Sequence, residues 1–391
     1  MVNVIFLGLV SFFSDISTEM VYPLIPLYLT SAFGASPSIV GLIEGIAESV
    51  AALLKVLSGY ITDKVGCRKR VAFCGYAAGL VYKGALVFTS SWGGVLAAKV
   101  LDRTGKGLRT APRDVLVSES AASGKAGGAF GLHKAMDMTG SALGIFISYL
   151  LLSSGSGQTD YKRLFALSAI PAVAGLLFMA FVKEKPVAPR RASPRGSLLE
   201  GWKKLDSRLR LYLFVSLIFT LGNSSNSFLL LRAQNTGFND TQVILLYLAY
   251  TVTAALLSIP FGRLSDKIGR KSVLVAGYIV FAAVYAGFAA GSSRALMWLV
   301  FIVYGAYTAL TSGAERAFIA EIAPPHLKGT MLGLQSTVTG TALLPASALA
   351  GILWDSISPA APFVLGAALS AAAAAVLAVF IKADKNKRPA A

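Results

Sequence analysis

Charged residues are scarce in this sequence of 391 residues, where Asp, Glu, Lys and Arg make up only 14%, against about 25% in an average soluble domain. Disorder is excluded, because a disordered chain combines high charge with low hydrophobicity and here 55% of the residues are hydrophobic. An ordinary soluble enzyme is excluded as well, because so much apolar surface could not be hidden from water. The two cysteines, Cys67 and Cys74, are too few for a disulfide framework, and we assign them no function. These absences leave a polytopic membrane protein.

Twelve stretches are long and apolar enough to cross a bilayer, which takes about 20 residues each. Turn-forming or charged clusters separate them, and several are rich in glycine, as close packing of membrane helices favours. The sequence therefore predicts an all-α membrane protein with twelve transmembrane helices. We expect them near residues 3–31, 39–61, 71–90, 93–113, 127–153, 163–183, 209–235, 240–261, 272–291, 294–318, 329–353 and 360–382.

Positive charge is in excess, with 36 Lys and Arg against 19 Asp and Glu, and its position along the chain explains it. On one side of the predicted bundle, the loops, the central segment and the C-terminal tail hold 25 of the basic residues, and the loops on the other side hold 3. Because short cytoplasmic loops are enriched in Lys and Arg, both termini are predicted to be cytoplasmic, in a multi-pass protein of the plasma (inner) membrane. The lipid bilayer is then the expected partner of the apolar surface, and nucleic acid is not expected.

The two halves of the sequence resemble each other. Residues 59–66 (Gly-Tyr-Ile-Thr-Asp-Lys-Val-Gly) align with residues 262–269 (Gly-Arg-Leu-Ser-Asp-Lys-Ile-Gly) at an offset of 203, and Glu119 aligns with Glu321 at an offset of 202. One insertion or deletion explains the change of offset. We predict two pseudo-symmetric six-helix bundles, an architecture of secondary transporters: residues 1–183, a cytoplasmic linker over 184–208, and residues 209–391 with a short basic tail.

The repeated loop carries a family resemblance. Residues 262–271 (Gly-x-x-x-Asp-Lys-x-Gly-Arg-Lys) resemble the loop 2–3 motif of the major facilitator superfamily, and in the first copy Cys67 stands where the first Arg is usual. Residues 101–107 resemble the helix 4 motif of proton-coupled members, and residues 20–26, with their paired prolines, look like the end of helix 1 in twelve-helix drug antiporters. The resemblance implies the major facilitator fold and a role in proton transfer for Arg103. The Gly-Pro motif usual in helix 5 of efflux antiporters is missing, which weakens the case for export over import.

The basic loops also predict a conformational latch. A carboxylate at a helix end can bind the N-terminal dipole of a neighbouring helix and an Arg, and such a contact can form in one conformation and break in another. The alternative is that these charges only orient the chain in the membrane. The predicted latch residues are Gly59, Asp63, Lys64, Gly66, Arg68, Gly262, Asp266, Lys267, Gly269, Arg270, Lys271, Arg113, Asp114, Glu315 and Arg316.

Ionisable residues inside membrane helices are costly and point to function. Most of them lie in the first half, at spacings of three or four residues that place each set on one helix face. We predict a charge network around a partly hydrated cavity, in which movement of a cation changes the proton affinity of a carboxylate; a static structural network is the alternative. In the second half, two asparagines interrupt helix 7 and suit a binding surface. The predicted cavity residues are Asp15, Glu19, Glu44, Glu48, Lys99, Asp102, Arg103, His133, Asp137, Asn223 and Asn226.

Together these features predict a proton-coupled secondary transporter that works by alternating access and exports small organic or drug-like solutes, as a monomer. Two alternatives stay open: uptake of an organic anion through the basic face of helix 4, and transport of a metal ion or metal chelate through the carboxylates. Dedicated metal sites are not predicted, because no tight spacing of His and Asp supports one. The sequence contains no phosphate loop, no GxSxG and no HExxH, so neither enzymatic activity nor a cofactor is expected.

Overall fold

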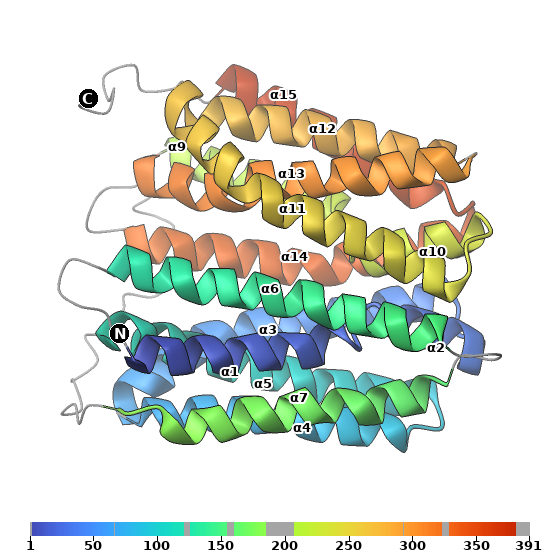
Figure 1. The fold of residues 1–391 in the computed structure, drawn as a ribbon. Coiled ribbons are helices and arrows are strands. Elements are labelled where there is room, and N and C mark those ends of the chain that lie inside the picture. Colours follow the sequence, from blue (N-terminus) through green and yellow to red (C-terminus); the bar gives the residue numbers. More distant parts are fainter. Residues whose placement is uncertain are drawn as a thin grey trace.

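A computed structural model describes residues 2–65, 67–120, 126–154, 160–184, 207–291, 293–322 and 328–380. Throughout these ranges the chain forms α-helices and no strand, so the predicted all-α class is confirmed. The helices lie roughly side by side along one direction, as Figure 1 shows. In order they are α1 (Val2–Glu19), α2 (Leu24–Phe33), α3 (Pro37–Val65), α4 (Arg68–Val87), α5 (Trp92–Ser120), α6 (Ala126–Ser153), α7 (Tyr161–Phe181), α9 (Ser207–Gly222), α10 (Ser227–Asn235), α11 (Asp240–Ile268), α12 (Arg270–Ala290), α13 (Arg294–Ile322), α14 (Lys328–Ser356) and α15 (Ala361–Phe380).

Two of the expected membrane crossings consist of two helices each. The first was expected as one segment, but it breaks between α1 and α2, where Pro23 and Pro26 each lack the backbone N–H that a continuous helix would use. The seventh breaks between α9 and α10 at residues 223–226, at the polar interruption that the sequence predicted. Both breaks place irregular backbone inside the membrane, which membrane proteins tolerate where it is buried in protein or lines a cavity.

Length and composition identify ten of the described helical segments as able to cross a membrane. α4 and α5 fall short because they carry charges, including Lys83 in α4 and the series from Lys99 to Arg113 in α5. Both are nevertheless long enough, at 20 and 29 residues, and both pack among the other helices. With them, the described helices make twelve crossings.

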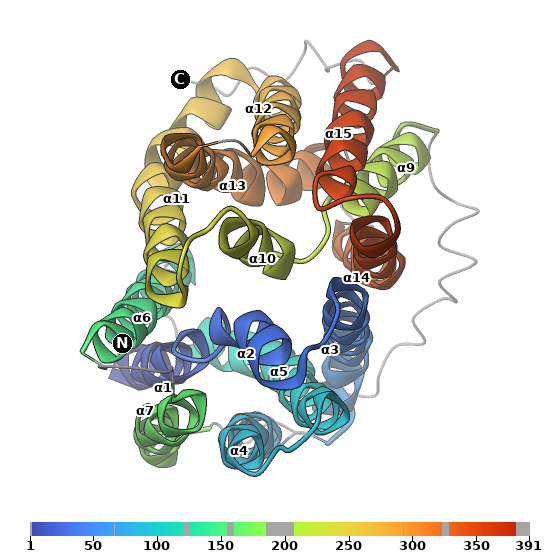
Figure 2. The same ribbon diagram turned by 90° about the vertical axis from the view of Figure 1, so that its right-hand side faces the viewer.

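The helices of the two halves of the chain occupy separate parts of the structure. Viewed along their axes, α1–α7 gather on one side and α9–α15 on the other (Figure 2). At the boundary α3 packs against α14 and α6 packs against α11. The division into bundles at 1–183 and 209–391 stays a prediction, and most of the predicted linker, residues 185–206, lies outside the described residues.

Glycines permit the closest contact between the halves, along α3 and α14. A Cβ on Gly45 would lie 2.9 Å from the Leu344 Cα, and a Cβ on Gly351 would lie 2.5 Å from the Ser38 Cα. Real Cβ atoms do not approach backbone so closely, so only glycine fits at these positions. Small residues that let helix backbones meet are a principal source of packing energy in membranes, where lipid is as apolar as the protein core.

The bundle has two different ends. α1 begins at one of them, and there α3 also turns into α4 next to Arg68, Lys69 and Arg70; we call it the basic end. α2 and α10 lie at the other, which we call the outer end (Figure 1). That the basic end faces the cytoplasm stays a prediction from the Lys and Arg distribution.

Candidate functional site

Two charged pairs join α3 to α5 deep inside the first half. The Lys99 Nζ donates to Glu44 Oε1, and the side chains of both are at most 1% exposed. One turn further along both helices, the Arg103 Nη2 lies 3.3 Å from Glu48 Oε1 and its Nε lies 3.8 Å from Asp102. The equal spacing of four residues in both helices puts the two pairs in register. The structure thus brings together five of the predicted cavity residues.

The second half contributes a donor to the first pair. The Ser227 hydroxyl, at the start of α10, donates to Glu44 Oε1 at 2.8 Å. Glu44 Oε2 is also buried but has no hydrogen-bond partner. Ser227 belongs to the polar break expected in helix 7 but was not among the predicted cavity residues, because nothing in the sequence connects it to Glu44.

Tyr22 covers the charged pairs where α1 breaks into α2. Its ring centroid lies 5.5 Å from Lys99 Nζ and 5.6 Å from Arg103 Cζ, within the range of cation–π attraction. On its other side the ring lies 6.1 Å from that of Tyr247 in α11. Tyr22 is therefore a second contact, besides Ser227, through which the charge network meets the second half.

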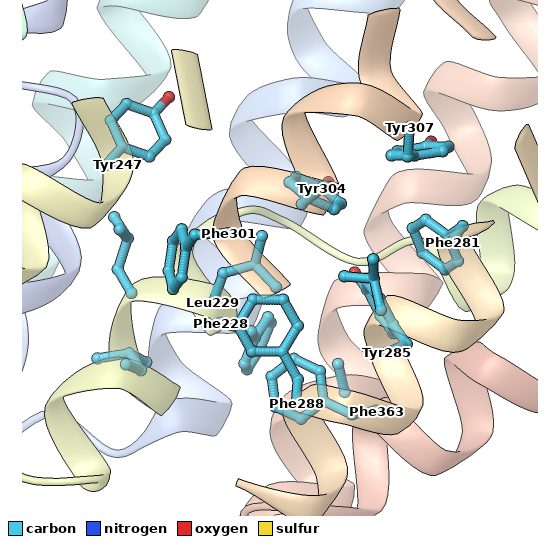
Figure 3. Close-up of a cluster of buried hydrophobic side chains, with 14 of the residues drawn as sticks. Phe228, Leu229, Tyr247, Phe281, Tyr285, Phe288, Phe301, Tyr304, Tyr307 and Phe363 are labelled. Atoms are coloured by element: carbon cyan, nitrogen blue, oxygen red, sulfur yellow. The ribbon is translucent and has the colours of Figure 1, made fainter. Parts of the chain in front are cut away.

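The facing part of the second half is a row of tyrosines. Ring centroids are 5.3 Å apart from Tyr247 to Tyr250, 5.1 Å from Tyr250 to Tyr304, and 5.3 Å from Tyr304 to Tyr307. Tyr304 and Tyr307 lie one turn apart on α13, beside the aromatic cluster that includes Phe281 and Tyr285 (Figure 3). These rings pack on one another, so the row is part of the core whether or not a solute contacts it.

The two predicted asparagines hold the broken helix to this row. The Tyr304 hydroxyl donates to Asn226 Oδ1 at 2.8 Å, and Asn223 Nδ2 donates to the Tyr307 hydroxyl at 3.3 Å. The amide side chains thus fix the non-helical turn between α9 and α10 against α13. Because that turn directly precedes Ser227, the asparagines also set where the Ser227 hydroxyl lies.

A cavity of about 840 Å³ lies between the halves toward the basic end. Its charged wall comes mainly from the first half and its other wall from small and hydroxyl-bearing residues of α11 and α13. Its charged and hydroxyl-bearing lining residues are Lys55, Thr110, Arg113, Asp114, His133, Lys134, Asp137, Ser258, Ser265, Asp266, Thr308 and Ser312. A solute of drug size fits this volume, since ligand pockets typically measure about 300–1,000 Å³.

Asp137 connects this cavity to the first helix. Its carboxyl group interacts electrostatically with that of Asp15 in α1, which packs against α6, and its Oδ2 accepts from Lys134 Nζ at 2.7 Å. Glu19, one turn beyond Asp15, forms no salt bridge in the described part of the chain and its buried Oε2 has no hydrogen-bond partner. His133 lies one turn before Asp137 on α6 and also lines the cavity, and its Nε2 lies 2.8 Å from the Ser11 hydroxyl of α1.

The outer end of the bundle is closed by contacts between the halves. The Tyr161 hydroxyl at the start of α7 donates to Asp240 Oδ2 at 2.5 Å, and Asp240 begins α11. The Ser38 backbone N–H at the start of α3 donates to Asp355 Oδ2 of α14 at 3.0 Å. With these contacts at one end and the cavity at the other, the structure is open toward the basic end.

The described latch side chains form ion pairs within each half. Arg68 lies 2.5 Å from Glu119, Arg270 lies 3.1 Å from Glu321, and Asp266 lies 3.8 Å from Arg270. Arg113 bonds its own neighbour Asp114 at 2.9 Å, and both line the cavity together with Asp266. Gly66 and the side chains of Asp63, Lys64 and Arg316 lie outside the description, so the contact predicted between the halves stays a prediction.

The prediction that Cys67 replaces the first Arg of the loop motif is wrong. Arg68 takes the place of Arg270, because each bonds the glutamate at the end of the matching helix. Lys69 likewise matches Lys271: each Nζ donates to a backbone carbonyl, of Ala180 and Ala378 respectively. Cys67 is therefore the inserted residue that shifts the offset from 203 to 202.

A helical membrane bundle of two similar halves, with a cavity open at one end between them, defines a transporter and not an enzyme. The chain belongs to the Major Facilitator Superfamily, whose sequence model matches residues 7–231 and 212–391. An uncharacterized MFS-type transporter of Methanocaldococcus jannaschii is 40% identical over 382 residues, 94% of this chain and 92% of that protein. The quinolone resistance protein NorA of Staphylococcus aureus is 25% identical over 154 residues, 39% of each chain. The crystal structure of the nucleoside transporter NupG has the same fold, with a TM-score of 0.79 at 14% identity, covering 98% of this chain and 100% of that one.

Proposed function

We propose that this transporter is proton-coupled and exports small organic solutes by alternating access. The observation that carries the proposal is Asp137, an acid of a membrane helix that lines the cavity and interacts with a second acid, Asp15, on the adjoining helix α1. Two neighbouring carboxyl groups favour binding of a shared proton, because two adjacent negative charges repel each other strongly in a membrane interior. Asp137 lines the cavity, so protons and solute would reach the same space from the basic end.

The closed outer end supports alternating access. For solute to leave there, the contacts of Tyr161 with Asp240 and of Ser38 with Asp355 have to break while the cavity closes at the basic end. A proton that enters from the outer side releases a free energy of about 2.3 kcal/mol per 100 mV of membrane potential, and any pH gradient adds to this free energy. Export is further supported by the partial similarity to a quinolone resistance protein. We propose that the protein works as a monomer in the plasma membrane with both termini in the cytoplasm.

Uptake of an organic anion is the second candidate, and one cluster favours it. Lys83, Asp102 and Arg109 converge on Gly79, where a Cβ would lie 3.5–3.7 Å from charged atoms of all three. Two buried cations thus lie around one carboxylate, which is also 3.8 Å from Arg103. Metal transport has no such support, because no group of three or more His, Cys, Asp or Glu in the described ranges could hold an ion.

Proteoliposomes with a pH-sensitive dye inside would test the proposal, with a quinolone and ethidium as the first solutes. We expect either solute to move protons in the wild type. Asp15→Asn and Asp137→Asn should abolish that proton movement while solute exchange without a gradient continues. Asp160→Asn serves as the matched control, because this acid is exposed and lies at the start of α7. Unchanged proton movement in both variants would refute coupling at this pair.

A further inference from the structure

Glu44 is a buried acid of the charge network that is bound by both halves of the protein. A single oxygen of its carboxylate accepts one hydrogen bond from each half. Its Oε1 accepts from Lys99 in α5 of the first half and from Ser227 in α10 of the second. All three residues are at most 1% exposed. Its other oxygen, Oε2, is buried without a partner. The charge of Glu44 is thus stabilised by one donor that moves with it and one that belongs to the opposite half.

The local structure holds Ser227 at this point. The chain leaves α9 at Gly222 and re-enters a helix at Ser227, where the backbone N–H groups of Ser227 and Phe228 donate to the hydroxyl and the carbonyl oxygen of Ser225. Next to it the Phe228 ring packs on Gly41 of α3, where an added Cβ would lie 2.9 Å from the ring. α10 therefore docks tightly against α3, and its N-terminal dipole favours a negative charge nearby.

The other charged and titratable groups around Glu44 come from the first half. They are Lys99 and Arg103 of α5, Glu48 of α3, Tyr82 of α4, and Tyr22 between α1 and α2. They move together when the halves rock, so their effect on Glu44 stays nearly constant. Ser227 alone among its direct donors is attached to the half that moves away.

We propose that Ser227 is the positioning residue that couples the conformation of the transporter to the charge of Glu44; this rests on the proposed proton coupling. α10 lies at the outer end (Figure 1), so opening that end withdraws Ser227 from Glu44. The carboxylate then loses a donor that stabilised its charged form. A proton from water adds to the free Oε2, and Lys99 stays a cation. When the outer end closes, Ser227 docks again and the proton is released toward the cavity.

The coupling is reciprocal by linkage, because a conformation that disfavours the charged carboxylate is in turn favoured by protonation. Acidification should therefore open the outer end of the wild type. The opening can be followed as the distance between spin labels placed on α7 and α11 near their outer ends, measured across a range of pH. Ser227→Ala removes the donor that distinguishes the two conformations, so its outer end should open at neutral pH about as far as the wild type opens in acid, and the pH dependence of opening should be lost.

Three further variants make the result decisive. Ser227→Thr keeps a hydroxyl and should keep the wild-type pH dependence of opening. Ser216→Ala is the matched control, because Ser216 is a buried serine of α9 and forms no bond to Glu44 within the described part of the chain. Ser227→Cys keeps the volume with a much weaker donor and gives the same loss of pH dependence if the alanine variant does not fold.

A pH dependence of opening that is unchanged in both Ser227→Ala and Ser227→Cys would overturn the inference. The inference would also be overturned if pH did not affect the outer end of the wild type while the proteoliposomes still showed solute-driven proton movement. In that case the proposed function would stand. If the outer end of the wild type responded to pH but the proteoliposomes showed no solute-driven proton movement, the proposed function would be refuted instead.

Discussion

Arg68 lies 2.5 Å from Glu119 in the first half, and the same contact recurs in the second half between Arg270 and Glu321 at 3.1 Å. Each arginine is the residue with which the helix after the loop begins, and each glutamate lies near the end of the following helix, α5 or α13. Two copies of one contact, each inside its own half, belong to the frame of the bundles. They would travel with the bundle through the transport cycle and would not open and close as a latch does.

Breaking the first of these pairs should therefore affect stability more than transport. We expect Arg68→Ala or Glu119→Gln to cost about 1 kcal/mol, since partly exposed ion pairs contribute little more. The melting temperature of the purified protein should fall by a few degrees, and the charge-swapped double variant Arg68→Glu/Glu119→Arg should recover part of it. Transport per folded molecule should be unchanged; its loss at an unaltered melting temperature would support the latch instead.

The pair of Glu44 and Lys99 should behave differently, because neither side chain reaches solvent. Lys99→Ala leaves a buried carboxylate without its cation, and such a change costs about 3–5 kcal/mol. The double variant Glu44→Gln/Lys99→Met removes both charges and should be clearly more stable than Lys99→Ala. Thermal unfolding in detergent measures the order. Equal melting temperatures for the single and the double variant would mean that the two charges are not coupled.

His133 should be dispensable for proton coupling. Its Nε2 lies 2.8 Å from the Ser11 hydroxyl between α6 and α1, and a glutamine amide can occupy the same position and keep the contact. We expect His133→Gln to retain solute-driven proton movement in proteoliposomes, whereas His133→Ala should lower the melting temperature. If His133→Gln moved solute but no protons, His133 would have to be added to the coupling residues.

The sequence predicted the helices and the polar break before Ser227 because both depend on local composition. It also predicted that Glu44 and Glu48 lie on the same face of one helix, and that Lys99 and Arg103 lie on the same face of a second helix. Helical periodicity alone determines these faces. It placed α3 and α5 in one charge network but could not say which acid pairs with which cation, because hydropathy carries no information on how two helices are rotated and aligned against each other. For the same reason the contact of Ser227 with Glu44, across 183 residues of sequence, was invisible.

The motif alignment failed where a single residue was inserted. The aligned letters placed Cys67 against Arg270, and only the bonds made by Arg68 and Arg270 show which positions correspond. A repeat found by sequence fixes the register on either side of an insertion, but the contacts decide where the insertion lies. Lys69 and Lys271, which donate to the carbonyls of Ala180 and Ala378, fix that register a second time.

The contact of α14 with α3 at the outer end offers a direct way to shift the conformational balance. A side chain on Gly351 would meet the Ser38 Cα at 2.5 Å and the Pro37 carbonyl oxygen at 2.8 Å, and backbone atoms cannot turn aside as a side chain can. Gly351→Val should therefore force the helices apart beside the bond from Ser38 to Asp355 and favour the conformation open at the outer end.

The measurement is labelling of a cysteine introduced at the outer end of α2 by a maleimide that cannot cross the membrane. Labelling should rise several-fold in Gly351→Val and stay at the wild-type level in Gly84→Val, where an added Cβ meets nothing within 4 Å. Equal labelling of both variants would show that α3 and α14 do not control access at this end.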